Sequence, residues 1–281
     1  MALAIHMVDV FGAGALSGNP LAVVIGADAL DTQDMQRLTR WLNLSETAFL
    51  FAPRHPEADY RLRIFTLDRE MPFAGHPTLG SCHVWLSIHN RLEHKAAIVQ
   101  ECGAGLVQIR RDRGRLAFAA PPLIRSGPPT AVELDEARQL LGIAASDILD
   151  AAWIDNGPGW LGIRLVSAEK VLSIAPARRW HTRVDVGVIG PHTNDDEPGF
   201  EVRAFFSDHR GAIVEDPVTG SLNASFAQWL FKTGIARDNY IAAQGTCLGR
   251  KGRIYLTRDE ADQVWVGGET RTHVKGELHG L

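Results

Sequence analysis

The chain has few cysteines and no hydrophobic segment long enough to cross a membrane. Its three cysteines, Cys82, Cys102 and Cys247, are odd in number and lack CxxC spacing, which argues against a disulfide framework and a zinc knuckle. No apolar run reaches the roughly 18 to 20 residues of a membrane span. His6 and Asp9 also interrupt the stretch in which a signal peptide needs an apolar core. We therefore expect a cytoplasmic protein with no membrane partner.

The chain also has no excess of basic residues over acidic ones. The chain carries 29 Lys and Arg residues against 33 Asp and Glu residues, for a formal net charge of -4. Nucleic-acid binding draws on an excess of basic side chains that neutralise phosphates, so nucleic acid is a poor candidate partner. The 281 residues, 45% hydrophobic and 22% charged, indicate a soluble globular protein with one large domain or two of ordinary size.

Sequence motifs for metals and nucleotide cofactors are absent as well. The histidines lack HExxH or HxH spacing with a nearby carboxylate, and no GxxxxGK[ST] segment occurs. Residues 12–14, Gly-Ala-Gly, follow an expected strand but lead into another strand instead of a helix, unlike a dinucleotide-binding turn. We therefore expect no metal and no cofactor, which leaves proton transfer by side chains as the main chemistry.

Hydrophobic spacing predicts strands and two helices in the first half of the chain. Strands are expected at residues 5–11, 21–25, 45–51 and 60–67 and through much of 97–119. A helix is expected from Asp31 to Leu42, with Asp31 or Thr32 as its N-cap. Its apolar or amphipathic positions are Met35, Leu38, Trp41 and Leu42.

Proline and glycine mark two further boundaries. A Pro/Gly-rich loop at residues 71–80 leads into a second expected helix, from about Thr78 to Leu92. The stretch 120–129 contains four prolines and is the best candidate for an interdomain linker.

The two halves of the chain share a repeat with a shift of 140 residues. Arg63 and Phe65 reappear as Arg203 and Phe205 (203 − 63 = 140). The same shift relates Pro77 to Pro217, Gly80 to Gly220 and Ser81 to Ser221. Each copy runs into an apolar helix that contains a Trp-Leu pair, although there the shift is 144 (229 − 85 = 144). We predict two similar domains, residues 1–120 and 121–281, with a terminal strand able to cross back to the first.

Three titratable residues stand near the expected loops. Glu46 lies at a helix–loop–strand transition, and His76 and Asp216 occupy the same repeat position (216 − 76 = 140). Burial and neighbouring groups can bring such side chains toward a pKa suited to proton transfer. Each residue also has a simpler explanation: a solvated surface charge for Glu46, a structural or capping role for His76, and a helix N-cap for Asp216. Two helix N-termini facing one cleft would suit a carboxylate or an enolate.

Short motifs follow one another in a specific order along nearly the whole chain. They lie at Val8–Phe11, Ser17–Val23, Leu42–Thr47, Arg63–Thr66, Pro72–Gly80 and Glu215–Ser221, with weaker matches at Gln244-Gly245, Gly249-Arg250 and Gly267-Gly268. Together they resemble the motifs of the phenazine-biosynthesis PhzF-like family. This resemblance implies an α+β, diaminopimelate-epimerase-like fold. In that fold, two pseudo-symmetric domains each wrap a β-barrel-like sheet around a central helix, and the active site lies between them.

The resemblance also implies roles for individual residues. Glu46, in Ser-Glu-Thr, matches the general acid/base of the family, and His76 and Asp216 match residues that line the same pocket. Four more positions match loop residues near the substrate or beside the base: Ser45, Gly75, Gly220 and Ser221. Ala74 and Pro217 stand near where related epimerases place two cysteines, which argues against a two-thiol mechanism.

The expected protein is thus a cofactor-independent isomerase that moves a proton on a small carboxylate-bearing substrate, cyclic or unsaturated, and forms a homodimer. Two alternatives stay open: a non-catalytic small-molecule binding protein on the same fold, and a racemase or lyase of a small amino or hydroxy acid. The chain departs from the family pattern at Gly249–Arg253 and within Phe205–Ile213, which includes Asp208, His209 and Arg210. Both segments bear on the substrate more than on the chemistry.

Overall fold

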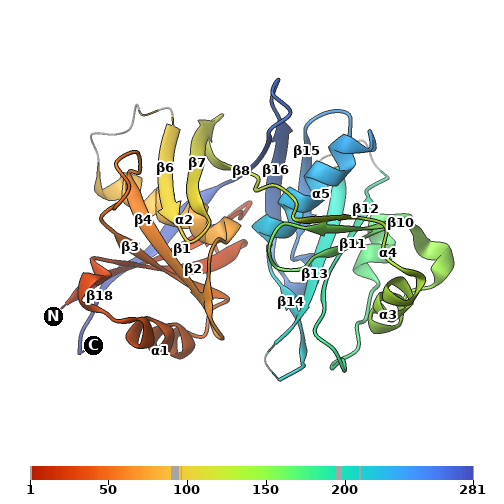
Figure 1. The fold of residues 1–281 in the computed structure, drawn as a ribbon, viewed down its shortest axis with the longest axis horizontal. Coiled ribbons are helices and arrows are strands. Elements are labelled where there is room, and N and C mark those ends of the chain that lie inside the picture. The colour runs from red at the N-terminus through yellow and green to blue at the C-terminus, as the bar shows by residue number, and fades with distance from the viewer. Residues whose placement is uncertain (1, 90–94, 96, 194–197, 209, 281) are drawn as a thin grey trace. The chain divides into compact units, whose positions relative to one another are not determined.

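The chain forms two compact units in the computed structural model, which describes residues 2–89, 95, 97–193, 198–208 and 210–280 (Figure 1). Residues 1–119 and 267–281 make up the first unit, and residues 120–266 make up the second. The last segment of the chain therefore belongs with the first unit.

The first unit is built from strands and two α-helices. Its elements are β1 (Leu3–Val10), β2 (Asn19–Ile25), η1 (Ala27–Ala29), α1 (Thr32–Leu42), β3 (Glu46–Phe51), β4 (Tyr60–Thr66), β5 (Glu70–Met71), α2 (Gly75–Ile88), β6 (Ala97–Cys102), β7 (Gly105–Asp112), β8 (Arg115–Ala119) and β18 (Thr270–Leu278).

A continuous series of strand pairings surrounds α2 in the first unit. The order is β18-β1-β2-β3-β4-β6-β7-β8, with β5 on β4; the pairs β2–β3 and β4–β6 are parallel and the others antiparallel. Helix α2 contacts strands from β1 to β18 around this series. The whole stretch Gly75–Cys82 is buried, as expected for a helix that is apolar on every side.

The second unit repeats this plan. Its elements are β9 (Arg125–Gly127), α3 (Ala131–Leu141), η3 (Ala145–Asp147), β10 (Ile148–Asp155), β11 (Leu161–Leu165), α4 (Ala168–Leu172), β12 (Asp185–Pro191), β13 (Phe200–Ser207), β14 (Ile213–Asp216), α5 (Gly220–Lys232), β15 (Tyr240–Gln244), η4 (Thr246–Leu248) and β16 (Gly252–Arg258). A further strand, β17 (Val264–Gly268), ends where the chain returns to the first unit.

Strand pairing in the second unit follows the order β9-β10-β11-β12-β13-β15-β16, with β14 on β13. The pairs β11–β12 and β13–β15 are parallel, at the positions equivalent to β2–β3 and β4–β6. Helix α5 packs on strands of this unit, including β10 and β16. The predicted α+β fold with two similar domains, each wrapped around a helix, is confirmed.

The 140-residue shift is correct up to the hairpin and wrong beyond it. Strands β4 and β13 begin 140 residues apart (200 − 60 = 140). Phe65 then pairs with Glu70, and Phe205 pairs with Glu215, so the shift after the hairpin is 145 (215 − 70 = 145). The longer hairpin of the second unit contains the five additional residues. His76 consequently corresponds to Ser221, and not to Asp216, which ends β14.

Helix boundaries also differ in part from the prediction. Asp31 is the N-cap of α1, as predicted, and its side chain accepts a hydrogen bond from the Asp34 amide at 2.8 Å. Trp41, however, is 76% exposed and lies outside the apolar face that buries Met35 and Leu38.

The second helix and the linker require two further corrections. Helix α2 begins at Gly75, three residues before the predicted Thr78, because the Pro/Gly-rich segment itself enters the helix. The predicted end at Leu92 lies outside the described residues. Within the predicted linker, β9 pairs antiparallel with β10, so part of that segment belongs to the sheet of the second unit.

Candidate active site

Glu46 is the first residue of β3, where the chain enters the sheet after α1. Its carboxylate side chain is 18% exposed, and Oε2 lies 3.5 Å from Nε2 of His76. Ser45 precedes it in the bend between α1 and β3 and is partly buried. The first unit therefore brings together two of the three predicted catalytic residues, and the carboxylate keeps some access to solvent.

His76 occupies the second position of α2 and is 3% exposed. Its Nδ1 lies 3.4 Å from Nδ2 of the buried Asn19, the first residue of β2. With the amide in this orientation, the nitrogen of Asn19 can only donate, so Nδ1 accepts and the imidazole proton sits on Nε2. The N–H of His76 is then on the nitrogen that lies near Glu46.

Burial keeps the His76 imidazole neutral. Loss of hydration lowers the pKa of His76 to about 3, from an ordinary value of 6.5. At neutral pH the 3.5 Å contact between His76 and Glu46 therefore involves an uncharged imidazole and is not an ion pair. His76 can donate a hydrogen bond, whereas Glu46 is the group of the two that is suited to accept a proton.

The start of α2 offers backbone donors beside these side chains. Ala74 is the N-cap and makes no side-chain capping bond, and Pro77 has no N–H group. The first helical bond to the cap runs from the Thr78 amide to the Ala74 carbonyl at 3.2 Å. The amides of Gly75 and His76 thus belong to the unpaired first turn of a helix without an acidic residue, an environment that favours an anion.

Asp216, the third predicted catalytic residue, lies in the second unit at the end of β14. Its Oδ2 accepts a hydrogen bond from Oγ1 of Thr219 at 2.6 Å. Thr219 is the N-cap of α5, so Asp216 does not cap the helix itself, contrary to one of the interpretations from the sequence. Instead, its carboxylate accepts a hydrogen bond from the side chain of Thr219, the cap residue.

The first turn of α5 contains Gly220 and Ser221. Oγ of Ser221 accepts a hydrogen bond from the indole N–H of Trp160 at 3.1 Å, and its carbonyl accepts one from Asn156 at 2.9 Å. Because the indole N–H can only donate, the hydroxyl hydrogen of Ser221 can be given to a bound acceptor. No acidic residue lies in this turn either. The second unit therefore presents a serine hydroxyl and backbone amides together.

Sequence reasoning missed the residues that hold these groups in place. Asn19 beside His76 lies inside the Ser17–Val23 motif, so that motif was the signal available for it. Trp160 and Asn156 had no comparable signal, because they come from a loop 61 and 65 residues away from Ser221. The contact between Thr219 and Asp216 could have been predicted, because the two residues are three positions apart in the sequence.

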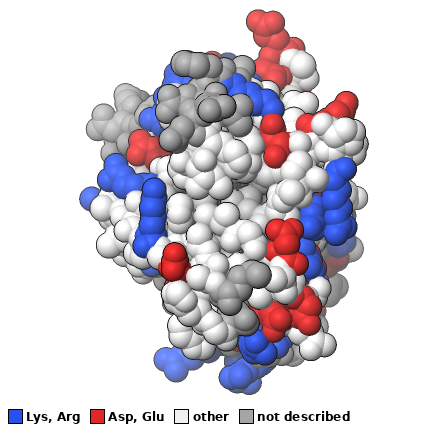
Figure 2. Space-filling view, turned by 90° about the vertical axis from the view of Figure 1, so that its left-hand side faces the viewer, with Lys and Arg blue, Asp and Glu red and all other residues white. Residues whose placement is uncertain are grey.

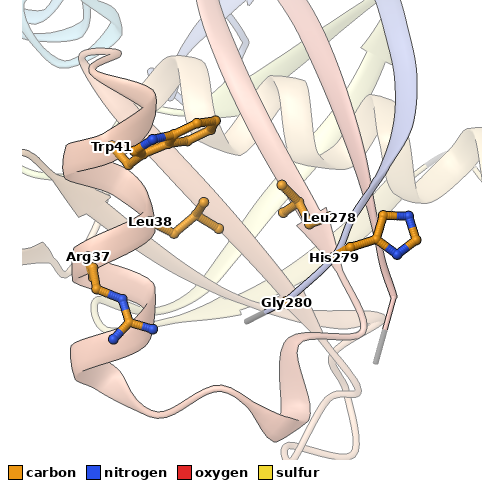
Figure 3. A pocket seen from close by; sticks show the side chains of 6 residues that line it. All are labelled: Arg37, Leu38, Trp41, Leu278, His279 and Gly280. Atoms are coloured by element: carbon orange, nitrogen blue, oxygen red, sulfur yellow. The ribbon is translucent and has the colours of Figure 1, made fainter.

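A pocket of about 330 Å³ also lies in the first unit, but it contains none of the predicted site residues (Figure 3). It is located between α1 and the end of β18, where Trp41 and Leu38 point toward Leu278 (Figure 3). Its lining is Arg37, Leu38, Trp41, Leu278, His279 and Gly280. Figure 2 faces the left-hand side of Figure 1, and it shows acidic and basic side chains scattered around a broad area without charged residues.

Two negative findings apply to the described part of the chain. Its His, Cys, Asp and Glu side chains form no group of three or more that could hold a metal ion. Among these same residues, no helix has the length and apolar character needed to cross a membrane.

A comparison with models of known protein families finds one that matches nearly the whole chain. The model of the phenazine biosynthesis-like protein family, PhzC-PhzF, matches residues 8–277. The chain belongs to this family. Relatives in this family that carry the name of an enzyme are named isomerases.

Relatives match over nearly their full length. The chain is 36% identical to an uncharacterized isomerase of Pasteurella multocida, over 98% of this chain and 93% of the relative. It is 32% identical to the antisense-enhancing sequence 1 protein of Schizosaccharomyces pombe, over 96% of each. It is 29% identical to the trans-2,3-dihydro-3-hydroxyanthranilate isomerase of Pseudomonas chlororaphis, over 96% of this chain and 94% of that enzyme.

A solved structure agrees with this assignment. The PhzF-family phenazine biosynthesis protein of Enterococcus faecalis superposes with a TM-score of 0.78 at 26% identity. The match covers 99% of this chain and 100% of that protein.

Proposed function

We propose that the chain is a cofactor-independent isomerase that moves a proton between carbon atoms of a small carboxylate-bearing substrate, cyclic or unsaturated. The main support is the pair formed by Glu46 and the buried, neutral His76, 3.5 Å apart beside the open first turn of α2. A relative at 29% identity is named for the isomerisation of trans-2,3-dihydro-3-hydroxyanthranilate. That compound is a carboxylate on a partly unsaturated ring, which fits the proposed substrate class.

In the proposed reaction, the Glu46 carboxylate removes a proton from an activated carbon of the substrate. The electrons of the broken C–H bond delocalise into the conjugated system and give a dienolate. The carboxylic acid of Glu46 then returns the proton to a different carbon, so the double bonds shift while atoms and charge are conserved. An acid linked to Asp216 is the other group able to return the proton. Hydrogen bonds from His76 and from backbone N–H groups stabilise the dienolate.

The remaining predicted residues are assigned to binding the substrate. The first-turn amides of α2 and α5, which include those of Gly75 and Gly220, are donors suited to the substrate carboxylate. Ser221 adds a hydroxyl donor that Trp160 orients. Ser45 lies in the bend directly before Glu46 and is assigned to the pocket beside it.

The proposal is tested by proton NMR in deuterated water with trans-2,3-dihydro-3-hydroxyanthranilate and a panel of small cyclic or unsaturated amino acids. We expect the wild type to isomerise a member of this set. The Glu46→Gln variant should be slower by about 10²- to 10⁴-fold, because amide and carboxylate have similar shapes but the amide cannot accept the proton. Glu57→Gln, at an exposed carboxylate of the same unit, is the matched control and should retain activity.

Other outcomes would select the alternatives. Deuterium uptake without net conversion would indicate a racemase. Binding without any exchange would indicate a non-catalytic binding protein. An active Glu46→Gln variant would show that a different residue is the base.

A further inference from the structure

The side-chain amide of Gln244 lies at the centre of a buried hydrogen-bond network at the start of α5. Gln244 is the last residue of β15 and is 0% exposed. Its Oε1 accepts from the Thr219 amide at 3.0 Å and from Nδ2 of Asn223 at 2.8 Å. Its Nε2 donates to Oγ1 of Thr219 at 2.9 Å and to the carbonyl oxygen of Asp216 at 3.1 Å. These four bonds use both the donor and the acceptor sides of the amide.

This network fixes the direction of the hydrogen bonds that join Gln244, Thr219 and Asp216. The backbone amide of Thr219 can only donate, so the group that faces it must be the oxygen of Gln244. The nitrogen of Gln244 then gives a hydrogen to the Thr219 hydroxyl, which turns its own hydrogen toward Oδ2 of Asp216 at 2.6 Å. Gln244 therefore holds both the backbone and, through Thr219, the carboxylate of Asp216.

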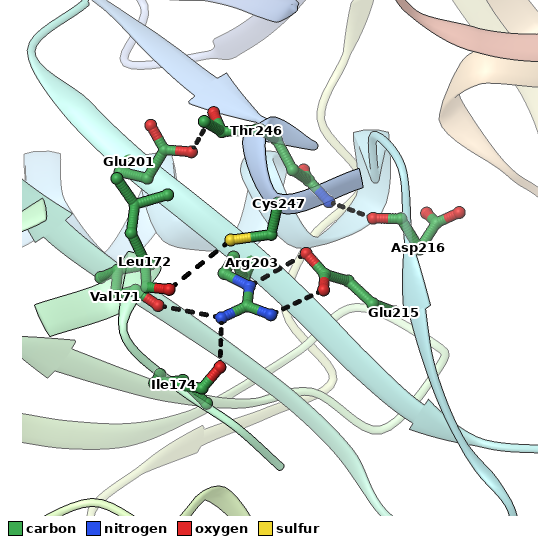
Figure 4. Close-up of polar contacts among 10 residues, drawn as sticks. Val171, Leu172, Ile174, Glu201, Arg203, Glu215, Asp216, Thr246 and Cys247 are labelled. Atoms are coloured by element: carbon green, nitrogen blue, oxygen red, sulfur yellow. Dashed lines mark hydrogen bonds and ion pairs between the residues drawn. The ribbon is translucent and has the colours of Figure 1, made fainter. Parts of the chain in front are cut away.

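The segment that follows Gln244 packs against the Asp216 loop from another side. Gly245 has a φ of 89°, and a Cβ built on it would lie 2.5 Å from the Pro217 carbonyl oxygen. Thr246 donates to the buried carboxylate of Glu201 in β13 at 2.6 Å, which anchors this segment to the sheet (Figure 4). The amide of Gln244 is thus supported by a rigid backbone.

A neighbouring ion pair supports the strand that carries Asp216. Arg203 in β13 donates to both carboxylate oxygens of Glu215, at 3.0 Å and 2.7 Å (Figure 4). The same guanidinium donates to the carbonyls of Val171 and Ile174 (Figure 4). A bidentate pair of this kind is directional as well as strong. The residue before Asp216 is therefore held independently of Gln244.

The first unit has a comparable buried glutamine with different contacts. Gln100 lies in β6, the counterpart of β15, and is also 0% exposed. Its oxygen accepts from the Tyr60 hydroxyl at 3.1 Å, and its nitrogen donates to Oγ1 of Thr78 at 3.0 Å. Neither of these two hydrogen bonds reaches Ala74, the cap residue of α2. The connection to a cap and a carboxylate thus distinguishes Gln244 from its counterpart.

We propose that Gln244 is a positioning residue of the isomerase site, which sets the orientation of the Asp216 carboxylate and of the first turn of α5. This inference rests on the proposed function, because it assigns Asp216 and that turn to the active site. Gln244 does not itself need to touch the substrate. Its effect passes through Thr219.

The test compares Gln244→Met with wild type, measuring kcat and KM in the NMR assay and amide exchange at Thr219. Methionine keeps the approximate size but removes all four hydrogen bonds. We expect kcat to fall about 10- to 100-fold, the range associated with misplacement of a site by about 1 Å. The Thr219 amide, having lost its acceptor, should exchange at least about tenfold faster, which corresponds to 1.4 kcal/mol.

Three further variants separate positioning from a general loss of stability. Thr219→Val, which removes the hydroxyl between Gln244 and Asp216, should lower kcat, and Thr219→Ser should restore it. Gln228→Met also removes an amide hydrogen bond of α5, the one to the Pro121 carbonyl, and should lower the melting temperature, but its kcat should stay within about twofold of wild type.

The possible failures are distinguishable. If the wild type is active and Gln244→Met retains its kcat, or if Thr219 exchange is unchanged, the role of Gln244 is wrong while the proposed function stands. If Gln228→Met lowers kcat as much as Gln244→Met, the effect is one of stability and the positioning role is wrong. If the wild type turns over none of the substrates, this inference fails together with the proposed function.

Discussion

Buried histidines should make the stability of the first unit sensitive to acid. Burial lowers the pKa of His6 and of His83, and it lowers that of His76 the most. Burial lowers the pKa of His76 to about 3 in the folded chain, against 6.5 for an unperturbed histidine. Between these two values the unfolded chain binds a proton that the folded chain does not. The free energy of unfolding therefore rises with pH in this window, by at most about 1.4 kcal/mol per pH unit, and this stability is lost as the pH falls from 6.5 toward 3.

Urea unfolding of His76→Gln between pH 4 and pH 7 measures this contribution. Glutamine does not titrate, so the variant should show a shallower pH dependence than wild type. His273→Gln, at an exposed histidine of the same unit, is the control and should leave the wild-type slope unchanged. Equal slopes for His76→Gln and wild type would mean that His76 titrates alike in the folded and unfolded chains, and the lowering of its pKa by burial would be wrong.

At the scale of one turn, Gly245 should be necessary for the shape of the Asp216 loop. Alanine at this position would have a positive φ of 89° and a Cβ 2.5 Å from the Pro217 carbonyl oxygen. The left-handed backbone alone costs an alanine about 1 to 2 kcal/mol, and the overlap with backbone adds about 1 to 3 kcal/mol. We expect Gly245→Ala to lower both stability and kcat.

Gly249, in the same segment, gives a matched comparison for this substitution. It also has a positive φ, 69°, but a Cβ there would have nothing within 4 Å. Gly249→Ala should therefore show the backbone cost without the displacement of Pro217. Chemical denaturation and the NMR assay compare the two variants. Equal losses in both would show that the contact with Pro217 has no effect on the site.

The sequence was most informative for features that depend on residues close to one another along the chain. Asp31 as the cap of α1 and the strand that contains Glu46 are local patterns, and both were predictable. The correspondence of β4 and β13 was predictable from the repeat. The change of the shift from 140 to 145 was predictable only in part, because the Trp-Leu pairs, 144 residues apart, indicate a longer second copy but do not show that the added residues lie in the β13–β14 hairpin. The contacts of Trp160 and Gln244 depend on tertiary folding.

At the scale of the whole chain, the first unit should depend on β18, a strand that follows the entire second unit in the sequence. β18 pairs antiparallel with β1 along its length, and Thr272 in β18 lies 3.0 Å from Nε2 of His83 in α2. Phe11, which follows β1, also donates its amide to the Glu269 carbonyl at 2.7 Å. Ending the chain at Gly268 removes these partners and leaves the edge of β1 and one side of α2 exposed to water.

Hydrogen exchange measured by mass spectrometry can test this dependence. In a chain that ends at Gly268, peptides from β1 and α2 should lose protection, because their hydrogen bonds and burial depend on β18. Peptides from β12 and β13 should keep their protection, since the partners of these strands lie within residues 120–266. A chain that ends at Leu278 retains all of β18 and serves as the control. Wild-type protection of β1 in the shorter chain would show that β1 and α2 are stable without it; His76 and Glu46 would then keep their arrangement independently of the C-terminal strand.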